Sequence, residues 1–312
     1  MAEESESVGT VVVAVVTSLG IAAAKAVGGV VSGSSAMLSE AAHSVADAVA
    51  EVLSPASPKR SAKPADEAHP LGYGPERYVR ALLASVATFV GAAVFAVYDG
   101  IHTLVRGEEP GDPAVSYVVL AVAFVREGYA LLVAGRRTKG EAPRTAAPPG
   151  RYVKAVPLGN VAALIGLSLA AGGLLGARLT GSRVYDGVAS LLIGLLLAGV
   201  AWELGRSNAG YLIGRPLPAA MRAEVREELL SVPHIEGVLE LTTLVQGPAE
   251  VLIAAKIDFH DLASARQVEA ACEDAEDQLR ERFPAIRRVY LNPTPTPTPP
   301  PTPTPTPSPA AF

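Results

Sequence analysis

The stretch SGSSAMLSEAAHSVAD, residues Ser32–Asp47, places three ionisable side chains inside a candidate membrane segment. His43 and Asp47 are four residues apart, so both project from one face of a helix, and Glu40 lies close to that face. Ionisable groups at membrane depth are costly and usually face a cavity, a pathway or a partner. An imidazole with a carboxylate suits Zn²⁺, and also Fe²⁺, Co²⁺, Ni²⁺ or Mn²⁺. The alternative is a His43–Asp47 hydrogen bond that only locks helix packing.

Apolar segments extend outward from this stretch on both sides. Hydrophobic residues make up 49% of the 312-residue chain and charged residues only 18%, whereas a soluble domain carries about 25% charged residues. Each segment is near the roughly 20 residues that cross a bilayer core. Six buried helices of a soluble protein are the alternative, which the segment lengths and the few internal charges disfavour. The segments are Gly9–Val31, Ala36–Ser54, Val79–Val105, Ala114–Gly135, Ala155–Leu179 and Val184–Gly205. They predict a membrane all-α six-helix bundle.

Charge and cysteine content exclude several other classes. The net charge is −5, so no basic excess points to nucleic acid. Cys272 is the single cysteine, which excludes an intrachain disulfide framework and a cysteine-cluster metal site. Met1–Ser7 is acidic, whereas a signal peptide needs a basic start. We therefore expect the first apolar segment to be a retained membrane helix.

The distribution of basic residues predicts the orientation, because cytoplasmic loops carry an excess of Lys and Arg. The two longer connections and their flanks contain Lys59, Arg60, Lys63, Arg77 and Arg80, and then Arg136, Arg137, Lys139, Arg144, Arg151 and Lys154. The three opposite loops contain only Arg106, Arg178 and Arg183. Both termini are therefore expected in the cytoplasm, with the chain in the cell (plasma) membrane.

The character of the sequence changes after Arg215-Pro216. A helix, two strands, a charged helix and a short strand are predicted at 219–231, 237–245, 250–259, 263–283 and 287–291. This order suggests a small cytosolic α+β (ferredoxin-like) sandwich with helices on one face of the sheet. Pro293–Pro309 is a run of Pro-Thr repeats, expected to be polyproline II or disordered. The expected parts are thus residues 1–8, 9–215, 216–292 and 293–312.

Further polar residues lie outside the first stretch. Asp66 and His69, in DEAHPLGYGPERY (Asp66–Tyr78), could bind a metal at the membrane surface, or could belong to a glycine-rich turn that leads into the third helix. Asp99, His102 and Glu127 are read as packing or gating groups, and His234 and His260 as surface residues.

Two motifs resemble the cation diffusion facilitator family of metal efflux transporters: SGSSAMLSEAAHSVAD and the later DEAHPLGYGPERY. YDGVASLLIGLLLAGVA (Tyr185–Ala201) and the following YLIG resemble its sixth helix and the exit into its cytosolic domain. The resemblance implies proton-coupled antiport of Zn²⁺ or a similar ion out of the cytoplasm, by alternating access in a homodimer. It implies a metal site with two ligands from the second helix, His43 and Asp47, and two from the fifth. The metal is the transported substrate, and no cofactor is implied.

The fifth segment departs from the family pattern. The resemblance is closest to a branch of the family with SEA-x-H-S-x-x-D in the second helix and EDSAALLG in the fifth. Asn160 falls where the family has a metal-binding Asp, Gly159 where that branch has Glu, and Val156 where many members have His. Leu239, Lys256 and Leu291 fall near cytosolic positions that often hold zinc-binding His. Two function classes therefore stay open: an antiporter using His43, Asp47, Asn160 and Glu40 or water, and a transport-impaired regulatory or partner subunit. A membrane enzyme ranks third, because no nucleophile–base or multi-His hydrolase arrangement is present.

Overall fold

The computed structural model describes residues 8–53, 63, 65–106, 111–140, 152–247 and 250–296. The chain divides into two compact units. The first comprises Met1–Arg215 with Val245–Glu250, and the second comprises Pro216–Leu244 with Val251–Phe312. Most of the predicted Pro-Thr tail, residues 297–312, lies outside the described residues, as does the acidic start, residues 1–7.

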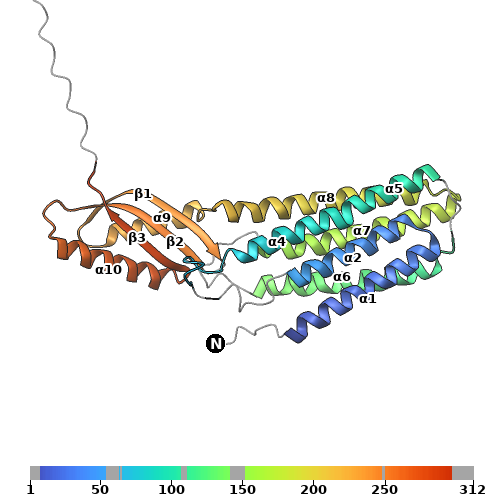
Figure 1. Ribbon diagram of the computed structural model, residues 1–312, viewed down its shortest axis with the longest axis horizontal. Helices are drawn as coiled ribbons and strands as arrows, with labels where there is room; N and C mark the ends of the chain where they lie inside the picture. The colour runs from blue at the N-terminus through green and yellow to red at the C-terminus, as the bar shows by residue number, and fades with distance from the viewer. Residues whose placement is uncertain are drawn as a thin grey trace, which may run out of the picture. The chain divides into compact units, whose positions relative to one another are not determined.

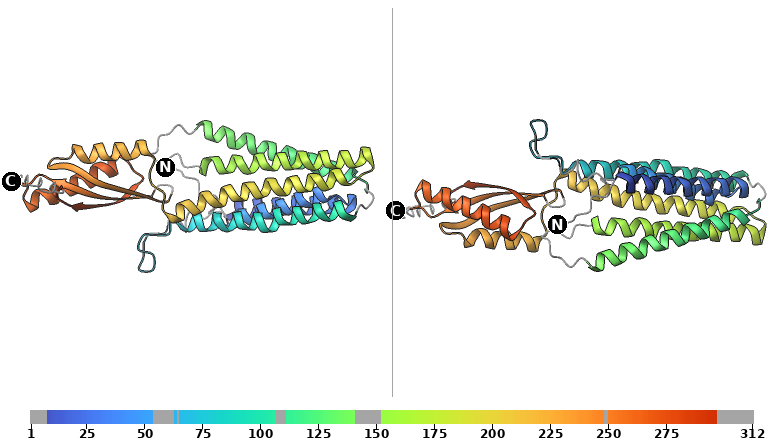
Figure 2. Two further views of the ribbon diagram at one scale, coloured as in Figure 1. Left: turned by 90° about the horizontal axis from the view of Figure 1, so that it is seen from above. Right: turned by 90° about the horizontal axis from the view of Figure 1, so that it is seen from below.

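The first unit is a bundle of long helices, and Figure 1 shows them running alongside one another. A π-helical turn, η1, interrupts the third long helix of the bundle and divides it into α4 and α5. In Figure 2, α6 lies beside α7 and α7 beside α8, and contacts between the same pairs support this order. The helices are α1 (Val8–Ser32), α2 (Ser35–Leu53), α4 (Glu76–Ala87), η1 (Thr88–Ala93), α5 (Val94–Arg106), α6 (Ala114–Gly140), α7 (Tyr152–Thr180) and α8 (Val184–Ile213). The prediction of an all-α membrane bundle is confirmed.

Among the described residues, five helical stretches are long and apolar enough to cross a membrane. The α2 helix is the exception, because Glu40, Asp47 and Glu51 lower its hydropathy. Its neighbours shield much of this polarity: α2 packs against α1, against α8 and against the α4–η1–α5 rod. Glu40 and His43 are buried as a result, at 0% and 5% exposure. The second predicted segment is thus a helix of the bundle that depends on its neighbours to bury polar groups.

Close approach between α5 and α8 comes from glycines. A Cβ on Gly100 would lie 2.9 Å from the Gly187 carbonyl oxygen, and a Cβ on Gly194 would lie 3.1 Å from that of Ala93. Small residues let membrane helices pack backbone to backbone. At this interface Ser190 donates its hydroxyl hydrogen to the Ala96 carbonyl at 2.8 Å. Ser39 of α2 must therefore be the donor in its 2.7 Å bond to the Ser190 oxygen, which ties three helices together.

The N-terminal end of α2 is held by a carboxylate from α8. Asp186 is 2% exposed. It accepts hydrogen bonds from the Ser34 hydroxyl and the Ser35 backbone N–H, both at 2.6 Å. Ser34 in turn caps the helix, since its Oγ accepts from the Met37 N–H at 3.1 Å. A negative charge at a helix N-terminus is stabilising, so Asp186 both caps α2 and locks it to α8.

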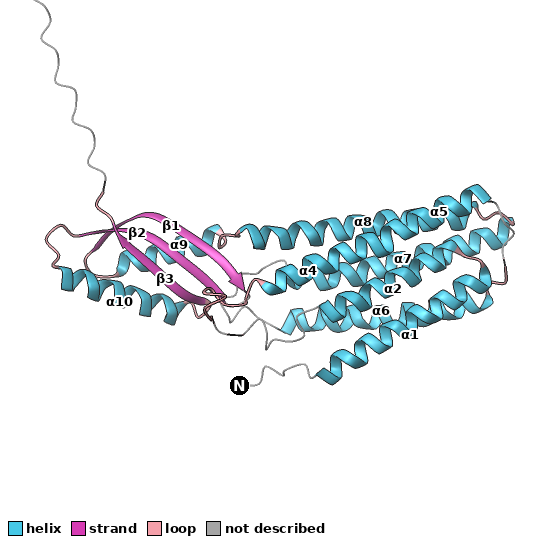
Figure 3. Ribbon diagram, in the orientation of Figure 1, coloured by secondary structure: helices cyan, strands magenta, loops and turns pink. Residues whose placement is uncertain are grey.

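The second unit is an α+β domain, as predicted. Figure 3 shows its three strands side by side, in the order β1–β2–β3. The β2 and β3 strands are parallel, with Ile253 opposite Val289. The α10 helix contacts α9 and β3, and begins with a capping box at Ser264. The elements are α9 (Ala219–Ser231), β1 (Ile235–Gly247), β2 (Glu250–Phe259), α10 (Ala265–Arg282) and β3 (Ile286–Pro293). Buried Val225, Leu229, Ile253, Ile257 and Leu279 form its core.

Candidate metal site

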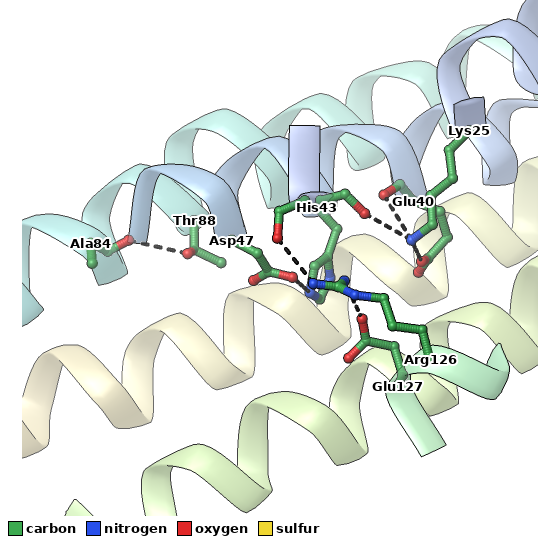
Figure 4. A network of polar contacts seen from close by, with 10 residues as sticks. Lys25, Glu40, His43, Asp47, Ala84, Thr88, Arg126 and Glu127 are labelled. Atoms are coloured by element: carbon green, nitrogen blue, oxygen red, sulfur yellow. Dashed lines mark hydrogen bonds and ion pairs between the residues drawn. The ribbon is translucent and has the colours of Figure 1, made fainter. Parts of the chain in front are cut away.

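His43 and Asp47 face each other from successive turns of α2, as Figure 4 shows. His43 Nε2 lies 3.0 Å from Asp47 Oδ2. The imidazole is nearly inaccessible, whereas the Asp47 side chain is 48% exposed. His43 Nδ1 is buried and has no hydrogen-bond partner among the described residues. The pair therefore offers a nitrogen and carboxylate oxygens on one face of α2, and its accessible member is Asp47.

Glu40 lies one turn before His43 and is bound to a lysine that the sequence analysis did not single out. Lys25 of α1 places Nζ 2.9 Å from Glu40 Oε2 and 2.8 Å from Ser44 Oγ. The lysine and glutamate side chains are 4% and 0% exposed, so this is a buried ion pair. A lone lysine within an apolar segment was the available signal, because a charge at that depth requires a partner.

Glu40 also contacts α7, the helix that carries Asn160. A Cβ on Gly166 would overlap Glu40 Oε1, so α7 can approach α2 here only because residue 166 has no side chain. Glu40 Oε1 is buried and has no hydrogen-bond partner among the described residues. One carboxylate oxygen of Glu40 is thus held by Lys25, while the other faces the backbone of α7.

The position of Asn160 along the bundle axis follows from helix geometry. Gly173 of α7 packs against Asp186, which caps the start of α2, and Gly166 packs against Glu40 farther along α2. The two helices are therefore antiparallel. At 1.5 Å per residue, Asn160 lies roughly 9 Å beyond Gly166, and Asp47 roughly 10 Å beyond Glu40, in the same direction. Asn160 is half-buried and at about the depth of the pair, although rotated by about 120° from the Gly166 face.

A second basic group approaches the pair from α6. Arg126 Nη1 lies 2.9 Å from Glu127 Oε1, and Nη2 donates to Ser18 Oγ of α1 at 3.1 Å. Figure 4 shows this guanidinium with Asp47 and His43, and its charge acts on Asp47. Glu127, read from the sequence as a packing or gating group, is thus the ion-pair partner of Arg126. The surroundings of the pair contain two fixed cations, of which the sequence analysis identified neither.

Asp66 and His69 lie close together in the loop before α4, with His69 Nδ1 3.7 Å from Asp66 Oδ1. The Asp66 carboxylate already accepts three hydrogen bonds of 2.8 Å, from Lys63 Nζ, the Tyr73 hydroxyl and the His69 N–H. The bonds from Lys63 and Tyr73 hold the pKa of the Asp66 carboxyl well below its ordinary value. A metal binding here would have to replace these donors.

The remaining polar residues lie apart from this cluster in their contacts. The ring of His102 stacks on Tyr98 with centroids 5.9 Å apart. His260 Nε2 lies 3.8 Å from Glu236 Oε1, and Lys256 pairs with Glu240 at 2.6 Å. Across the part of the chain that the structure describes, no group of three or more His, Cys, Asp or Glu side chains is arranged to hold a metal ion. His43 and Asp47 alone would therefore need further ligands.

Comparison with known proteins extends to both units. Residues 11–213 match the cation efflux transmembrane domain, and residues 217–295 match the cation efflux protein cytoplasmic domain. The chain is 30% identical to metal tolerance protein C4 of Arabidopsis thaliana, over 73% of this chain and 52% of that protein. It is 31% identical to the mitochondrial proton-coupled zinc antiporter SLC30A9 of Xenopus laevis, over 74% of this chain and 43% of that protein.

A bacterial relative matches over more of its own length. The cation-efflux pump FieF of Escherichia fergusonii is 29% identical over 81% of both chains. By contrast, the chain spans about half the length of the plant and frog relatives. The transmembrane match covers more than half of the 312 residues, and the second match follows it directly. On these matches, the chain belongs to the cation diffusion facilitator family.

Proposed function

We propose that the protein exports a divalent cation, Zn²⁺ or a similar metal, from the cytoplasm in exchange for protons. The relatives named as a zinc antiporter and a cation-efflux pump support this reading. The match to a cytoplasmic domain of cation efflux proteins supports a homodimer with that unit in the cytoplasm. Apolar helices long enough to cross a bilayer support a location in a membrane, which we propose to be the plasma membrane.

The observation that carries the proposal is the His43–Asp47 pair at 3.0 Å on α2. In the absence of a cation, the carboxylate accepts the imidazole N–H. A divalent cation would take the place of this hydrogen, with neutral imidazole nitrogen and carboxylate oxygen as ligands. Binding therefore releases a proton from His43 whenever the imidazole was charged, which couples metal affinity to pH.

Asn160 would supply a further oxygen at that depth, and water the rest of the shell. An amide oxygen is a weaker ligand than a carboxylate, so the site relies on Asp47 for its charge. Glu40 is the other acidic group of the cluster, but Lys25 holds one of its oxygens. We further propose that Asp66 and His69 bind the metal at the membrane surface. There the metal would have to displace the hydrogen bonds that the Asp66 carboxylate now accepts.

A transport-impaired partner or regulatory subunit is the second candidate, and one observation favours it. The fifth membrane helix contributes Asn160 rather than a carboxylate, while Lys25 and Arg126 bring two positive charges near the pair. With one carboxylate fewer and two positive charges nearby, the site attracts a divalent cation more weakly. Flux measured on the purified protein separates the two candidates.

The test is Zn²⁺ flux into proteoliposomes that contain the full chain. We expect flux in the wild type and its loss in both His43→Ala and Asp47→Asn. His260→Ala is the matched control, because it removes an exposed imidazole of the C-terminal unit and should transport normally. Lower pH on the loading side should weaken binding, because His43 must be deprotonated to bind metal.

Two outcomes would contradict the proposal. Normal flux through folded His43→Ala would reduce the pair to a packing hydrogen bond. A folded wild type with no flux of Zn²⁺, Mn²⁺ or Fe²⁺ would leave the partner-subunit reading.

A further inference from the structure

Lys25 is an ammonium group held entirely by oxygen atoms of α2. Its Nζ donates to Glu40 Oε2 at 2.9 Å, to Ser44 Oγ at 2.8 Å and to the Glu40 carbonyl oxygen at 3.4 Å. An ammonium has three hydrogens to donate, so these acceptors satisfy it. The side chain is 4% exposed, which leaves water little access. A cation with carboxylate, hydroxyl and carbonyl neighbours thus already sits one helical turn from His43.

The Lys25 ammonium determines whether the Glu40 carboxylate is available to bind a metal ion. Glu40 and His43 are three residues apart on α2, so without Lys25 their side chains could reach one metal ion from the same face. Glu40 Oε1 has no hydrogen-bond partner, and His43 Nδ1 has none either, among the described residues. Lys25, Glu40 and His43 are also close enough to act on one another electrostatically. Two acceptor atoms beside the pair are therefore unused, and the fixed positive charge beside them is that of Lys25.

We propose that Lys25 sets the metal affinity of the His43–Asp47 site, by occupying Glu40 as an internal counter-ion and keeping this carboxylate out of the metal's coordination shell. The inference rests on the proposed function of that pair. A dication that used Glu40 would lie close to the ammonium, and repulsion between like charges is strong where water is scarce. Lys25 is thus an affinity-determining residue that acts on the site through Glu40, the carboxylate it holds.

The consequence for transport follows from the need to release the ion. A site in a transport pathway must bind strongly enough to load and weakly enough to unload. Two carboxylates and an imidazole on one helix would bind a divalent transition metal far more tightly than one carboxylate and an imidazole. By neutralising Glu40, Lys25 keeps the site in the weaker range.

The experiment compares Zn²⁺ affinity of the purified full-length chain in detergent, by calorimetry, with and without the ammonium. Lys25→Met has a side chain of similar length without the charge. We expect its Zn²⁺ affinity to rise by roughly tenfold or more, because the number of charged ligands tunes the affinity of a metal site over several orders of magnitude. Loss of a merely structural contact would lower affinity, so the direction of the change identifies the role.

Two further variants locate the effect. Lys25→Met combined with Glu40→Gln should return to wild-type affinity, because the gain depends on the released carboxylate. Lys25→Arg keeps a cation beside Glu40 and should show no gain. If Lys25→Met fails to fold, Lys25→Gln serves instead, because its amide can hydrogen-bond to Glu40 and Ser44 without a charge.

Two results would overturn the inference: unchanged or weaker Zn²⁺ binding in a folded, uncharged Lys25 variant, or a gain that persists when Glu40→Gln is added. Failure of the proposed function looks different. In that case wild-type binding would be absent, or would be insensitive to His43→Ala and Asp47→Asn, whatever Lys25 does.

Discussion

Asn160 stands where the resemblance to the family predicts a metal-binding Asp. It lies on α7, half-buried, at roughly the depth of Asp47. An amide has a dipole but no net charge. A site composed of His43, Asp47 and Asn160 therefore carries one negative charge fewer than a site with a second carboxylate.

We predict that Asn160→Asp strengthens Zn²⁺ and Mn²⁺ binding by roughly tenfold or more, because ligand charge tunes the affinity of oxygen-rich sites over several orders of magnitude. Calorimetry on the two purified proteins measures it. Asn208→Asp is the matched control: Asn208 is a half-buried amide of α8 and lies about 20 Å beyond His43, toward the C-terminal end of α8, by helix rise. Equal affinity in wild type and Asn160→Asp would place residue 160 outside the site.

The α2 helix is the element on which the proposed site depends, because it carries Glu40, His43 and Asp47. Glu40 and His43 on its polar face are buried by neighbouring helices, and its first turn is held by Asp186. His43 lies eight residues after Ser35, about 12 Å from that capped end. The position of the imidazole is therefore set by a contact made far from it in the sequence.

We predict that Asp186→Asn destabilises the bundle by about 1.5–3 kcal/mol, the range for hydrogen bonds to a charged group. An amide NH₂ would face the Ser34 or Ser35 donor, where a carboxylate oxygen now accepts. Reversible denaturation in detergent, followed by circular dichroism, gives the difference. Asp112→Asn is the control: among the described residues this exposed side chain accepts only from the Ala114 N–H, and Asn can do the same. Equal losses in both variants would refute a special role for Asp186.

Sequence reasoning identified α2 as the polar helix but did not identify its partners. The i, i+4 spacing of His43 and Asp47 is local, so a helix brings them together. Lys25 and Arg126 act across the fold: Lys25 meets Glu40 from α1, and Arg126 joins α6 to Ser18 of α1. Periodicity cannot show which side chain a lone charge meets. The motif assigned Asn160 to the fifth membrane helix. Its level along the bundle, close to that of Asp47, could be inferred only from the contact between Gly166 and Glu40 in the structure.

The whole molecule joins a helical unit to an α+β unit, and both fold classes could be read from the sequence. Apolar segment length predicts the first, and the alternation of helix and strand predicts the second. Basic residues concentrate in the connections between the second and third and between the fourth and fifth helices, which predicts that these face the cytoplasm.

Cysteine labelling tests this orientation in a Cys272→Ser background, since Cys272 is the single cysteine. The exposed Thr180, at which α7 ends, serves as the outward probe. We expect an impermeant maleimide to label Thr180→Cys on intact cells, and to label Glu67→Cys only after permeabilisation. Labelling of both from the same side would contradict the predicted topology.

The wide turn η1 has a consequence for insertions and deletions. A π-helix bonds each N–H to the fifth residue back instead of the fourth, so one surplus residue is absorbed within Thr88–Ala93. The helical stretches on its two sides keep a common face. Removing one residue from this segment would close it to an ordinary helix and leave Gly100 against Gly187. The same removal within α5, ahead of Gly100, would turn that glycine about 100° away from its partner. The third membrane helix can therefore lose one residue within Thr88–Ala93 without losing the packing of Gly100 against Gly187.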